Sequence, residues 1–279
     1  MKKIIAAFDG LRFSASTLEE AISLAQRHSA HLVGVFLQEF VHTGFAVFEA
    51  VETQSYPAGK EMVDRLHRQD AADSKASVDL FEKSCREAGL SHSVHCDKNS
   101  ALEDILHESI FADILLIDRH ETFSSLEENI PGWFLKSLLH GVQCPVWLVS
   151  KKTGPVNRLV FLYDGDASSV YSMKMFTYLF PDMAGSEIQV LTFKSNTLDL
   201  GLPDNELVHE WMKRHYPRAV YKVVKGGPNE LFTLLKEEGP DILVVIGAYE
   251  RSRLSTWLLP SLADELMQKI KAPIFIAHS

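Results

Sequence analysis

Several features that would place a protein quickly in a functional class are missing from this 279-residue chain. Its three cysteines, Cys85, Cys96 and Cys144, are far apart and lack the C-x-x-C spacing of metal or redox sites. We therefore expect reduced, partly buried thiols. No apolar run reaches the roughly 18–20 residues that a membrane helix needs. The formal net charge of −9 argues against a nucleic-acid partner, because phosphate contacts require a basic face.

Motifs for catalysis and metal binding are also missing. The sequence contains no G-x-x-x-x-G-K-[ST], G-x-G-x-x-G or H-E-x-x-H pattern. His92 and His95 lie on a predicted strand, where residues three apart point to opposite faces and cannot easily share one ion. We therefore assign no catalytic residue and no metal ligand, and the sequence favours a protein that is not an efficient enzyme.

The N-terminal stretch Met1–Asp9 has two lysines and a short apolar run, which ends at Asp9-Gly10. A signal peptide needs a longer apolar region and a cleavage site of small residues. We interpret this stretch as the first strand of a cytoplasmic protein whose partners include neither a membrane nor a nucleic acid.

What the sequence does contain is an internal repeat. Three segments of the first half return in the second half in the same order: Ile4–Gly10 as Leu159–Gly165, Ala112–Ile117 as Pro240–Val245, and Cys144–Val149 as Ala272–Ala277. The offset falls from 155 to 128 residues, so the first copy carries about 27 additional residues (155 − 128 = 27). We predict two domains, residues 1–150 and 157–279, with an insertion in the first domain at about 40–74.

Strand and helix patterns alternate within each copy. Asp241–Ile246 is an apolar, largely β-branched run bounded by turn residues, as in a strand covered on both faces. Lys60–Ala88 is a long helical pattern, and Ser16 with Glu19 forms a predicted capping box. Such alternation requires right-handed βαβ crossovers. The predicted fold class is α/β, with two tandem Rossmann-like domains of the adenine nucleotide alpha hydrolase-like type. Each domain has a five-stranded parallel sheet with helices on both faces.

The loop after Asp241–Ile246 carries the pattern that points to a family. Ligands of open parallel sheets bind beyond the carboxyl ends of the strands, so a ligand is expected at this loop. It reads Gly247-Ala-Tyr-Glu250, nine residues, and then Pro260-Ser261. The stretch resembles the C-terminal half of a universal stress protein domain, whose ATP-binding members carry G-x2-G-x9-G-[ST] here. Three further signals recur in both copies: a first strand that ends in Asp-Gly, a later strand with Asp-Ile-Leu, and a last strand that follows a proline. The chain as a whole therefore resembles a tandem universal stress protein.

Both later glycines of that pattern are replaced. A carboxylate at Glu250 repels phosphate, and Pro260 lacks an N–H that could hold it. In the first copy the corresponding positions read Asp118-Arg-His-Glu121, and acidic residues again stand where phosphate would bind. The frame of a nucleotide site is therefore kept, while its contacts to phosphate are damaged.

The resemblance implies roles for individual residues. Asp164 and Thr192 match positions at the adenine end of the family's ATP site, and Gly247 and Ser261 match positions at its phosphate end. Asp9 and, in the second strand, Val35 hold the matching positions of the first copy. ATP or another adenine nucleotide would thus be a cofactor of the second domain.

Two functional hypotheses follow. The first is a cytoplasmic regulatory or interaction protein of the stress response, with weak ATP binding or none. The alternative is a protein that senses or slowly hydrolyses ATP in its second domain. A nucleotide hydrolase of related fold is a third class, for which the sequence offers no catalytic motif.

The resemblance also implies partners. In such families the last strand pairs with its counterpart, so Pro145–Val149 and Pro273–Ala277 would join the two domains as an internal pseudo-dimer and bury an apolar edge. The apolar segment Val41–Val51 either covers the first domain's crevice or forms a partner surface. A homodimer or another protein partner is compatible with either role of this segment.

Overall fold

The computed structural model describes residues 1–37, 56–96, 100–123, 130–151, 156–194, 201–239, 241–248 and 262–278. Four predicted features lie outside these residues: the apolar segment Val41–Val51 and the loop positions Glu250, Pro260 and Ser261.

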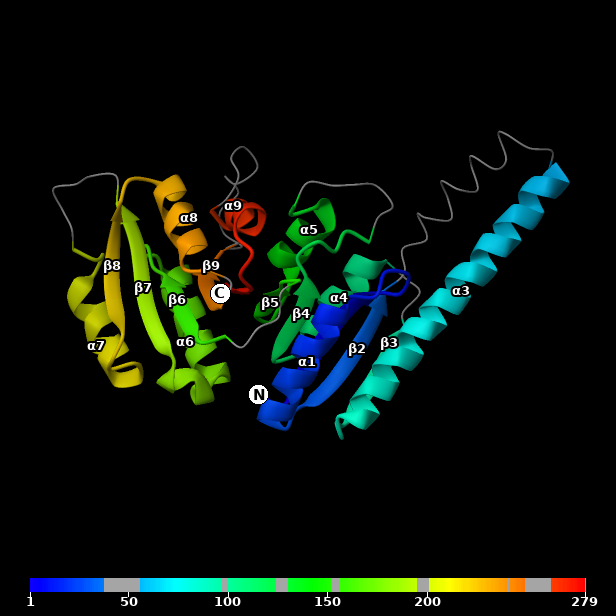
Figure 1. The fold of residues 1–279 in the computed structure, drawn as a ribbon, viewed down its shortest axis with the longest axis horizontal. Coiled ribbons are helices and arrows are strands. Elements are labelled where there is room, and N and C mark those ends of the chain that lie inside the picture. Colours follow the sequence, from blue (N-terminus) through cyan, green and yellow to red (C-terminus); the bar gives the residue numbers. More distant parts are fainter. Residues whose placement is uncertain are drawn as a thin grey trace. The chain divides into compact units, whose positions relative to one another are not determined.

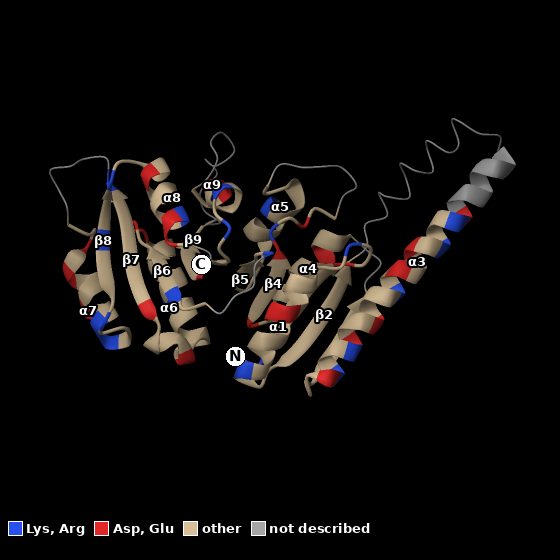
Figure 2. Ribbon diagram, in the orientation of Figure 1, with Lys and Arg blue, Asp and Glu red and all other residues tan. Residues whose placement is uncertain are grey.

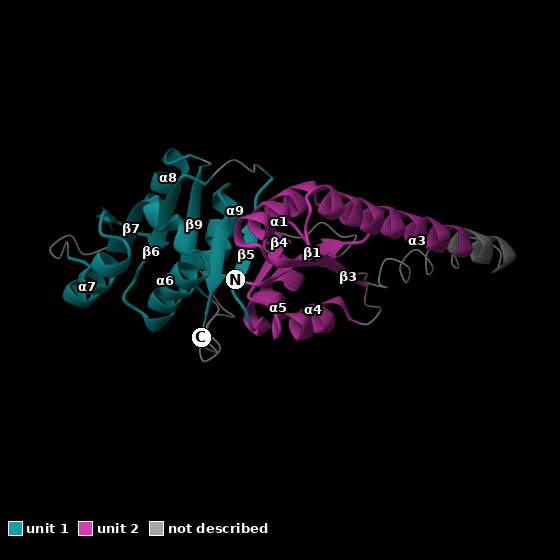
Figure 3. Ribbon diagram, turned by 90° about the horizontal axis from the view of Figure 1, so that it is seen from below, with its two compact units in different colours: residues 1, 144–279 teal, residues 2–143 magenta. Residues whose placement is uncertain are grey.

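The chain divides into two compact units, shown in different colours in Figure 3. The N-terminal unit comprises residues 2–143 and is unit 2 of that figure. The C-terminal unit comprises residues 144–279 with Met1 and is unit 1. The division precedes the strand Val146–Val149, which the sequence repeat assigns to the first copy. The boundaries 1–150 and 157–279 are those of the sequence repeat. As limits of folded domains they stay a prediction.

In the described part of the N-terminal unit, four parallel strands follow the order β3-β2-β1-β4 (Figure 1). The strands are β1 (Lys3–Asp9), β2 (His31–Leu37), β3 (His92–Cys96) and β4 (Ile114–Asp118). The helices are α1 (Ala15–His28), α3 (Tyr56–Glu87), α4 (Ala101–Ser109) and α5 (Trp133–Gly141). All of β4 is buried, and so are β1 and β2 after their first residues, as expected for strands covered on both faces.

The C-terminal unit orders its strands β5-β10-β9-β6-β7-β8. They are β5 (Val146–Val149), β6 (Arg158–Leu162), β7 (Glu187–Lys194), β8 (Val220–Lys225), β9 (Ile242–Gly247) and β10 (Ile274–Ala277). The helices are α6 (Ala167–Leu179), α7 (Asn205–His215), α8 (Pro228–Glu237) and α9 (Leu262–Lys269), with a 3-10 helix, η1, at Pro181–Gly185. Strands β6 to β10 are parallel, as predicted for the second copy.

Strand β5 is the exception to the parallel arrangement. It runs antiparallel to β10, with Trp147 opposite Phe275. The pairing predicted between the last strands of the two copies is therefore present, and both strands belong to the C-terminal unit.

Aromatic side chains fill one face of the C-terminal sheet. Phe161 of β6 pairs with a β7 residue that also pairs with Tyr221 of β8. It likewise pairs with a β9 residue that also pairs with Phe275 of β10. The three aromatic side chains therefore lie on the same face of the sheet. The ring of Phe176 on α6 packs edge-on against Phe161 and Phe275, with centroids 5.9 and 5.2 Å away. His209 on α7 covers Tyr221 at 3.9 Å. These contacts fix α6 and α7 over the strands whose ends form the site described below.

The start of α1 differs from the prediction. Its N-cap is Ser14, whose side chain accepts a hydrogen bond from the Thr17 N–H at 3.3 Å, and the predicted capping box at Ser16 is wrong. The Ser14 hydroxyl also donates to Asp118 at 3.0 Å. That partner is 104 positions away, so no local pattern could reveal which serine caps the helix.

Helix α3 begins four residues before the predicted start at Lys60 and takes up part of the predicted insertion. Phe81 and Cys85 anchor its C-terminal part and are fully buried, whereas the described side chains from residue 64 to 76 include none that is buried. Basic and acidic side chains are interspersed along this exposed stretch (Figure 2). Among the described residues, no helix is long and apolar enough to cross a membrane.

Candidate functional site

A cavity of about 140 Å³ lies where β6, β7 and β9 end in the C-terminal unit. Three of the predicted nucleotide residues, Asp164, Thr192 and Gly247, line it together. Leu162, Leu231 and Ile246 supply apolar walls. Of the other two predicted residues, Asp9 belongs to the N-terminal unit, and Ser261 is outside the described residues. The cavity lies at the carboxyl ends of parallel strands, where ligands of such sheets bind.

Asp164 leads from β6 into α6. One carboxylate oxygen, Oδ1, accepts the Asp166 N–H at 2.9 Å and closes a turn, which is what a short acidic side chain does at a strand end. Gly165 completes this turn at φ +91°, a left-handed conformation that favours glycine. The side chain of Asp164 is exposed, and its Oδ2 atom has no partner in the described part of the chain. It is therefore available as an acceptor for a ligand.

Thr192, near the end of β7, is only 4% exposed. Its hydroxyl has no hydrogen-bond partner within the ranges that the structure describes, although the residue lines the cavity. A hydroxyl that lines a cavity can donate a hydrogen bond to a ligand and accept one from it. Thr192 is thus the cavity's second polar group that a ligand could satisfy.

The sequence did not single out Tyr163, which lines the cavity, or its hydrogen-bond partner Pro203. The Tyr163 hydroxyl donates to the Pro203 carbonyl at 3.1 Å. Burial raises the pKa of Tyr163, and the charges of Asp204 and Asp164 raise it further, so the phenol stays a neutral donor. A Cβ atom on Gly165 would lie 2.6 Å from Pro203. Pro203 lies 40 residues beyond Tyr163, so no local sequence pattern could have predicted this contact.

Gly247 is a glycine because of the space around it. A Cβ atom there would lie 2.2 Å from the carbonyl oxygen of Ser168 and 2.6 Å from the backbone nitrogen of Ser169, in the first turn of α6. Close packing between the end of β9 and the start of α6 therefore accounts for this glycine without a phosphate. Its match to the family motif is not by itself a sign of nucleotide binding.

The N-terminal unit fills the corresponding place with phenylalanine rings. Strand register pairs Leu162 with Leu191 and Ala7 with Val35, so the counterpart of Thr192, one residue on, is Phe36. The sequence-based matching of Thr192 to Val35 is therefore wrong by one residue. Phe36 is 1% exposed.

A stack of three rings surrounds that position. Phe13 from the loop after β1 stacks on Phe8 with ring centroids 4.9 Å apart, and Phe8 stacks on Phe36 at 5.2 Å. Phe81 of α3 packs edge-on against Phe8 at 5.7 Å. The position that Thr192 holds beside the cavity of the C-terminal unit is thus packed with aromatic rings in the N-terminal unit.

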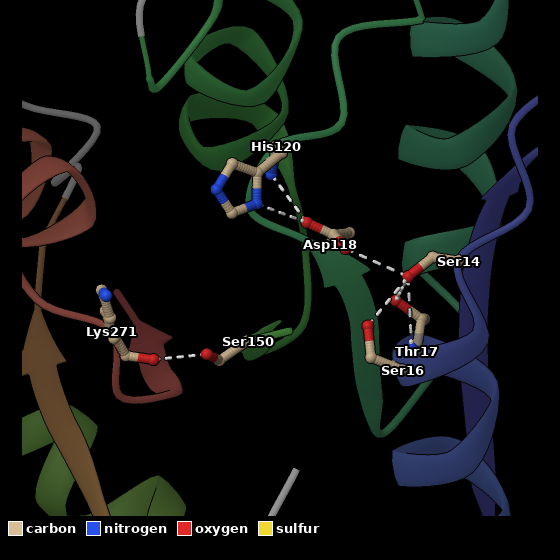
Figure 4. A network of polar contacts seen from close by, with 7 residues as sticks. All are labelled: Ser14, Ser16, Thr17, Asp118, His120, Ser150 and Lys271. Atoms are coloured by element: carbon tan, nitrogen blue, oxygen red, sulfur yellow. Dashed lines mark hydrogen bonds and ion pairs between the residues drawn. The ribbon is translucent and has the colours of Figure 1, made fainter. Parts of the chain in front are cut away.

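Polar side chains at the end of β4 and the start of α1 form a hydrogen-bond network, as Figure 4 shows. Register relates Asp118 at the end of β4 to Gly247 at the end of β9, since Ala6 pairs with Leu116 and Phe161 with Val245. Asp118 accepts bonds from Ser14 at 3.0 Å and from the backbone and ring of His120, both at 2.9 Å. Burial opposes ionisation, but these bonds hold the pKa of Asp118 below its usual value.

This network does not form a nucleophile–base pair. Ser14 donates to the carboxylate of Asp118 and not to the imidazole of His120, so no base stands ready to take its proton. The lowered pKa of Asp118 makes that carboxylate a poor base. The arrangement positions charges and caps a helix, and it supplies no activated nucleophile.

The two histidines of β3 diverge, as their spacing predicted. His92 packs against the Phe81 ring of α3, with centroids 6.2 Å apart, and His95 bonds Glu108 of α4 at 2.5 Å. Within the described ranges, no group of three or more His, Cys, Asp or Glu side chains is arranged to hold a metal ion.

Comparison with protein-family models gave no match, and comparison with curated proteins gave none either. Solved structures do match over the full length. A universal stress protein from Archaeoglobus fulgidus superposes with a TM-score of 0.68 at 11% identity, covering 99% of this chain and 98% of that one. A Pseudomonas aeruginosa structure that bears the universal stress protein name gives a TM-score of 0.62 at 14% identity, covering 100% and 93%. The chain has the universal stress protein fold.

The predicted fold class is therefore confirmed, and at these identities the likeness concerns the fold alone. This chain also matches the cytoplasmic domain of a prokaryotic cation chloride cotransporter. That match has a TM-score of 0.52 at 10% identity and covers 99% of this chain and 94% of that one. Since proteins of such different kinds share the fold, function must be argued from the site.

Proposed function

We propose that this protein is a non-catalytic regulatory protein of the universal stress type, in which the C-terminal unit alone binds an adenine nucleoside or nucleotide. One observation carries the proposal, namely the difference between two corresponding sheet edges. The C-terminal edge has a cavity of about 140 Å³ lined by Thr192, whose hydroxyl is unpaired among the described residues. The N-terminal edge places Phe36 at that position and stacks it with Phe8. A stress-response role is part of this proposal.

The cavity suits the nucleoside part of such a ligand better than its phosphates. Its walls are largely apolar, and Thr192 and Asp164 offer a hydroxyl and a carboxylate, which can pair with the N–H and O–H groups of a base or ribose. Phosphate has less support. Gly247 is explained by packing, and the sequence puts a carboxylate at Glu250 and a proline at Pro260 in the loop that would hold phosphate. Adenosine should therefore bind at least as tightly as ATP.

Calorimetric titration of the full chain with adenosine, AMP and Mg-ATP tests this order. The Thr192→Val variant keeps the volume of the side chain and removes the hydroxyl, so adenosine affinity should fall roughly 2- to 10-fold, the value of one hydrogen bond. Thr233→Val is the matched control, because Thr233 is exposed on α8 and, among the residues that the structure describes, bonds only the Asn229 carbonyl, at 2.9 Å. It should leave affinity unchanged. Absence of binding by all three compounds at millimolar concentration would refute the ligand proposal.

A second variant tests the phosphate argument separately. Restoring the family glycines with Glu250→Gly and Pro260→Gly should tighten Mg-ATP binding by about tenfold or more, because it removes a repulsive charge and returns an N–H group. Adenosine affinity should not change. If ATP already binds the unmodified protein more tightly than adenosine, phosphate is held despite Glu250, and the ATP-sensing alternative is favoured over our proposal.

A further inference from the structure

Three carboxyl groups are buried where β1 and β4 end in the N-terminal unit. Asp9 is 3% exposed, Asp118 is 8% exposed and Glu121 is 9% exposed. Asp118 and Glu121 belong to the segment Asp118–Phe123, which stands where the family would have its first phosphate-loop glycines. The proposed function does not use this segment, because its ligand binds in the other unit.

The three carboxyl groups differ in what stabilises their charge. Asp118 has bonds from Ser14 and His120, as described above. Asp9 accepts the Leu11 N–H at Oδ1, 2.8 Å away, while its buried Oδ2 has no hydrogen-bond partner in the described part and faces Arg12 Nε at 3.6 Å. Among the described residues, Glu121 receives a single long bond, from the Phe123 N–H to Oε1 at 3.4 Å. Glu121 is therefore the least supported of the three as an anion.

The charges around Glu121 come from three elements. Burial raises the pKa of Glu121 to about 8, and the negative charges of Asp9 on β1 and Asp118 on β4 act in the same direction. The Phe123 N–H and Arg12, in the loop after β1, oppose this shift without cancelling it. At neutral pH the side chain is a carboxylic acid and can donate a hydrogen bond. Asp9 Oδ2 is a buried acceptor that lacks a donor of this kind.

The segment around Glu121 is packed tightly on the unit. Arg119 is 3% exposed, and burial lowers its pKa to about 10 although Asp118 opposes this. Phe123 is 1% exposed with a left-handed φ of 49°, and its ring lies 4.4 Å from Phe134 of α5. A non-glycine residue pays for this backbone conformation, so the packed state depends on its burial. An added negative charge on Glu121 would act against that burial.

We propose that Asp118–Phe123 is a proton-sensing switch of the N-terminal unit. With a proton on Glu121, the segment packs against the ends of β1 and β4. When a base in the solvent takes that proton, the carboxylate is left beside Asp9 and Asp118, and the segment detaches until Glu121 reaches water. In this view the protein has replaced a nucleotide site with a site for a proton.

The full chain, with its glutamate carboxyl carbons labelled with ¹³C, gives a direct test by NMR. The Glu121 signal, identified by its absence in Glu121→Gln, should titrate near pH 8 and not near the ordinary 4.5. If the detached segment titrates at 4.5 and the packed segment at about 8, opening should increase on the order of a hundredfold from about pH 6 to about pH 9. Amide hydrogen exchange of residues 119–123, corrected for its intrinsic dependence on pH, measures this opening.

Three variants separate the switch from general effects of pH. Glu121→Gln cannot lose a proton, so its segment should stay protected at both pH values. Asp9→Asn removes a neighbouring charge and should shift the Glu121 titration to lower pH. Glu103→Gln, at an exposed position on α4, should behave as the unmodified protein. The proposal is overturned if Glu121 titrates near 4.5, or if exchange of this segment rises no more than that of the rest of the unit. Should Glu121→Gln fail to fold, the glutamate signal whose titration shifts in Asp9→Asn identifies Glu121, and the titrations of these two proteins still decide.

Discussion

Replacing Glu121 by glutamine should abolish about 3 kcal/mol of pH-dependent loss of stability between about pH 5 and about pH 8. The reason is that burial raises the pKa of Glu121 from its ordinary 4.5 to about 8. A carboxyl with a raised pKa contributes stability that is fully present below about 4.5 and is lost as the pH rises through about 8. Over this range the unfolded chain releases the proton and the folded chain keeps it. Glutamine keeps the shape and uncharged state of the acid, so it avoids this loss.

Urea denaturation at a series of pH values measures the effect, and the informative quantity is the difference between unmodified protein and variant. His31 contributes with the opposite sign, since burial and the nearby His92, Lys3 and His95 lower its pKa and its stability contribution grows as the pH rises. Both proteins contain His31, so its contribution cancels. Glu103→Gln should follow the unmodified protein at every pH. Equal pH profiles for Glu121→Gln and the unmodified protein would contradict the buried-acid interpretation.

The sequence predicted the fold because its signals are local and repeated. The strand predicted at Asp241–Ile246 is β9, shifted by one residue, since an apolar run between turn residues depends little on distant contacts. The changed offset between the copies located extra residues, part of which helix α3 takes up. The pairing of β5 with β10 followed from the family resemblance, and the structure adds that the two strands run antiparallel.

The candidate site was less accessible to sequence reasoning, because its decisive contacts join distant residues. Phe36 is the counterpart of Thr192 in the N-terminal unit. This could be recognised only after the two copies had been aligned by strand register. The acidic residues after β4 were read as repelling phosphate. The structure adds that Ser14 and His120 hold Asp118, while Glu121 is buried with little support. Both carboxyl groups are buried, so the difference in their hydrogen bonds is what makes Glu121, and not Asp118, the candidate proton sensor.

Substituting alanine for Gly247 should destabilise the C-terminal unit by about 3 kcal/mol, at the upper end of what overpacking usually costs. The added Cβ would lie 2.2 Å from the Ser168 carbonyl oxygen and 2.3 Å from its carbonyl carbon. Both atoms are backbone in the first turn of α6, so no side chain can rotate to make room. Either the end of β9 or the start of α6 must move, and both border the cavity that contains Asp164 and Thr192.

Gly185→Ala in η1 is the matched control, because a Cβ atom there meets nothing within 4 Å. Its free energy of unfolding should stay within about 0.5 kcal/mol of the unmodified value. Urea denaturation followed by tryptophan fluorescence compares the two variants, since Trp147 and Trp211 both belong to the C-terminal unit. Equal stability of the two would show that α6 yields at no cost and that Gly247 is kept for a reason other than packing. The expected result has a practical consequence for ligand studies. A loss of nucleotide binding in Gly247→Ala would report a displaced helix, so only Thr192→Val and the paired Glu250 and Pro260 substitutions test contacts to the ligand itself.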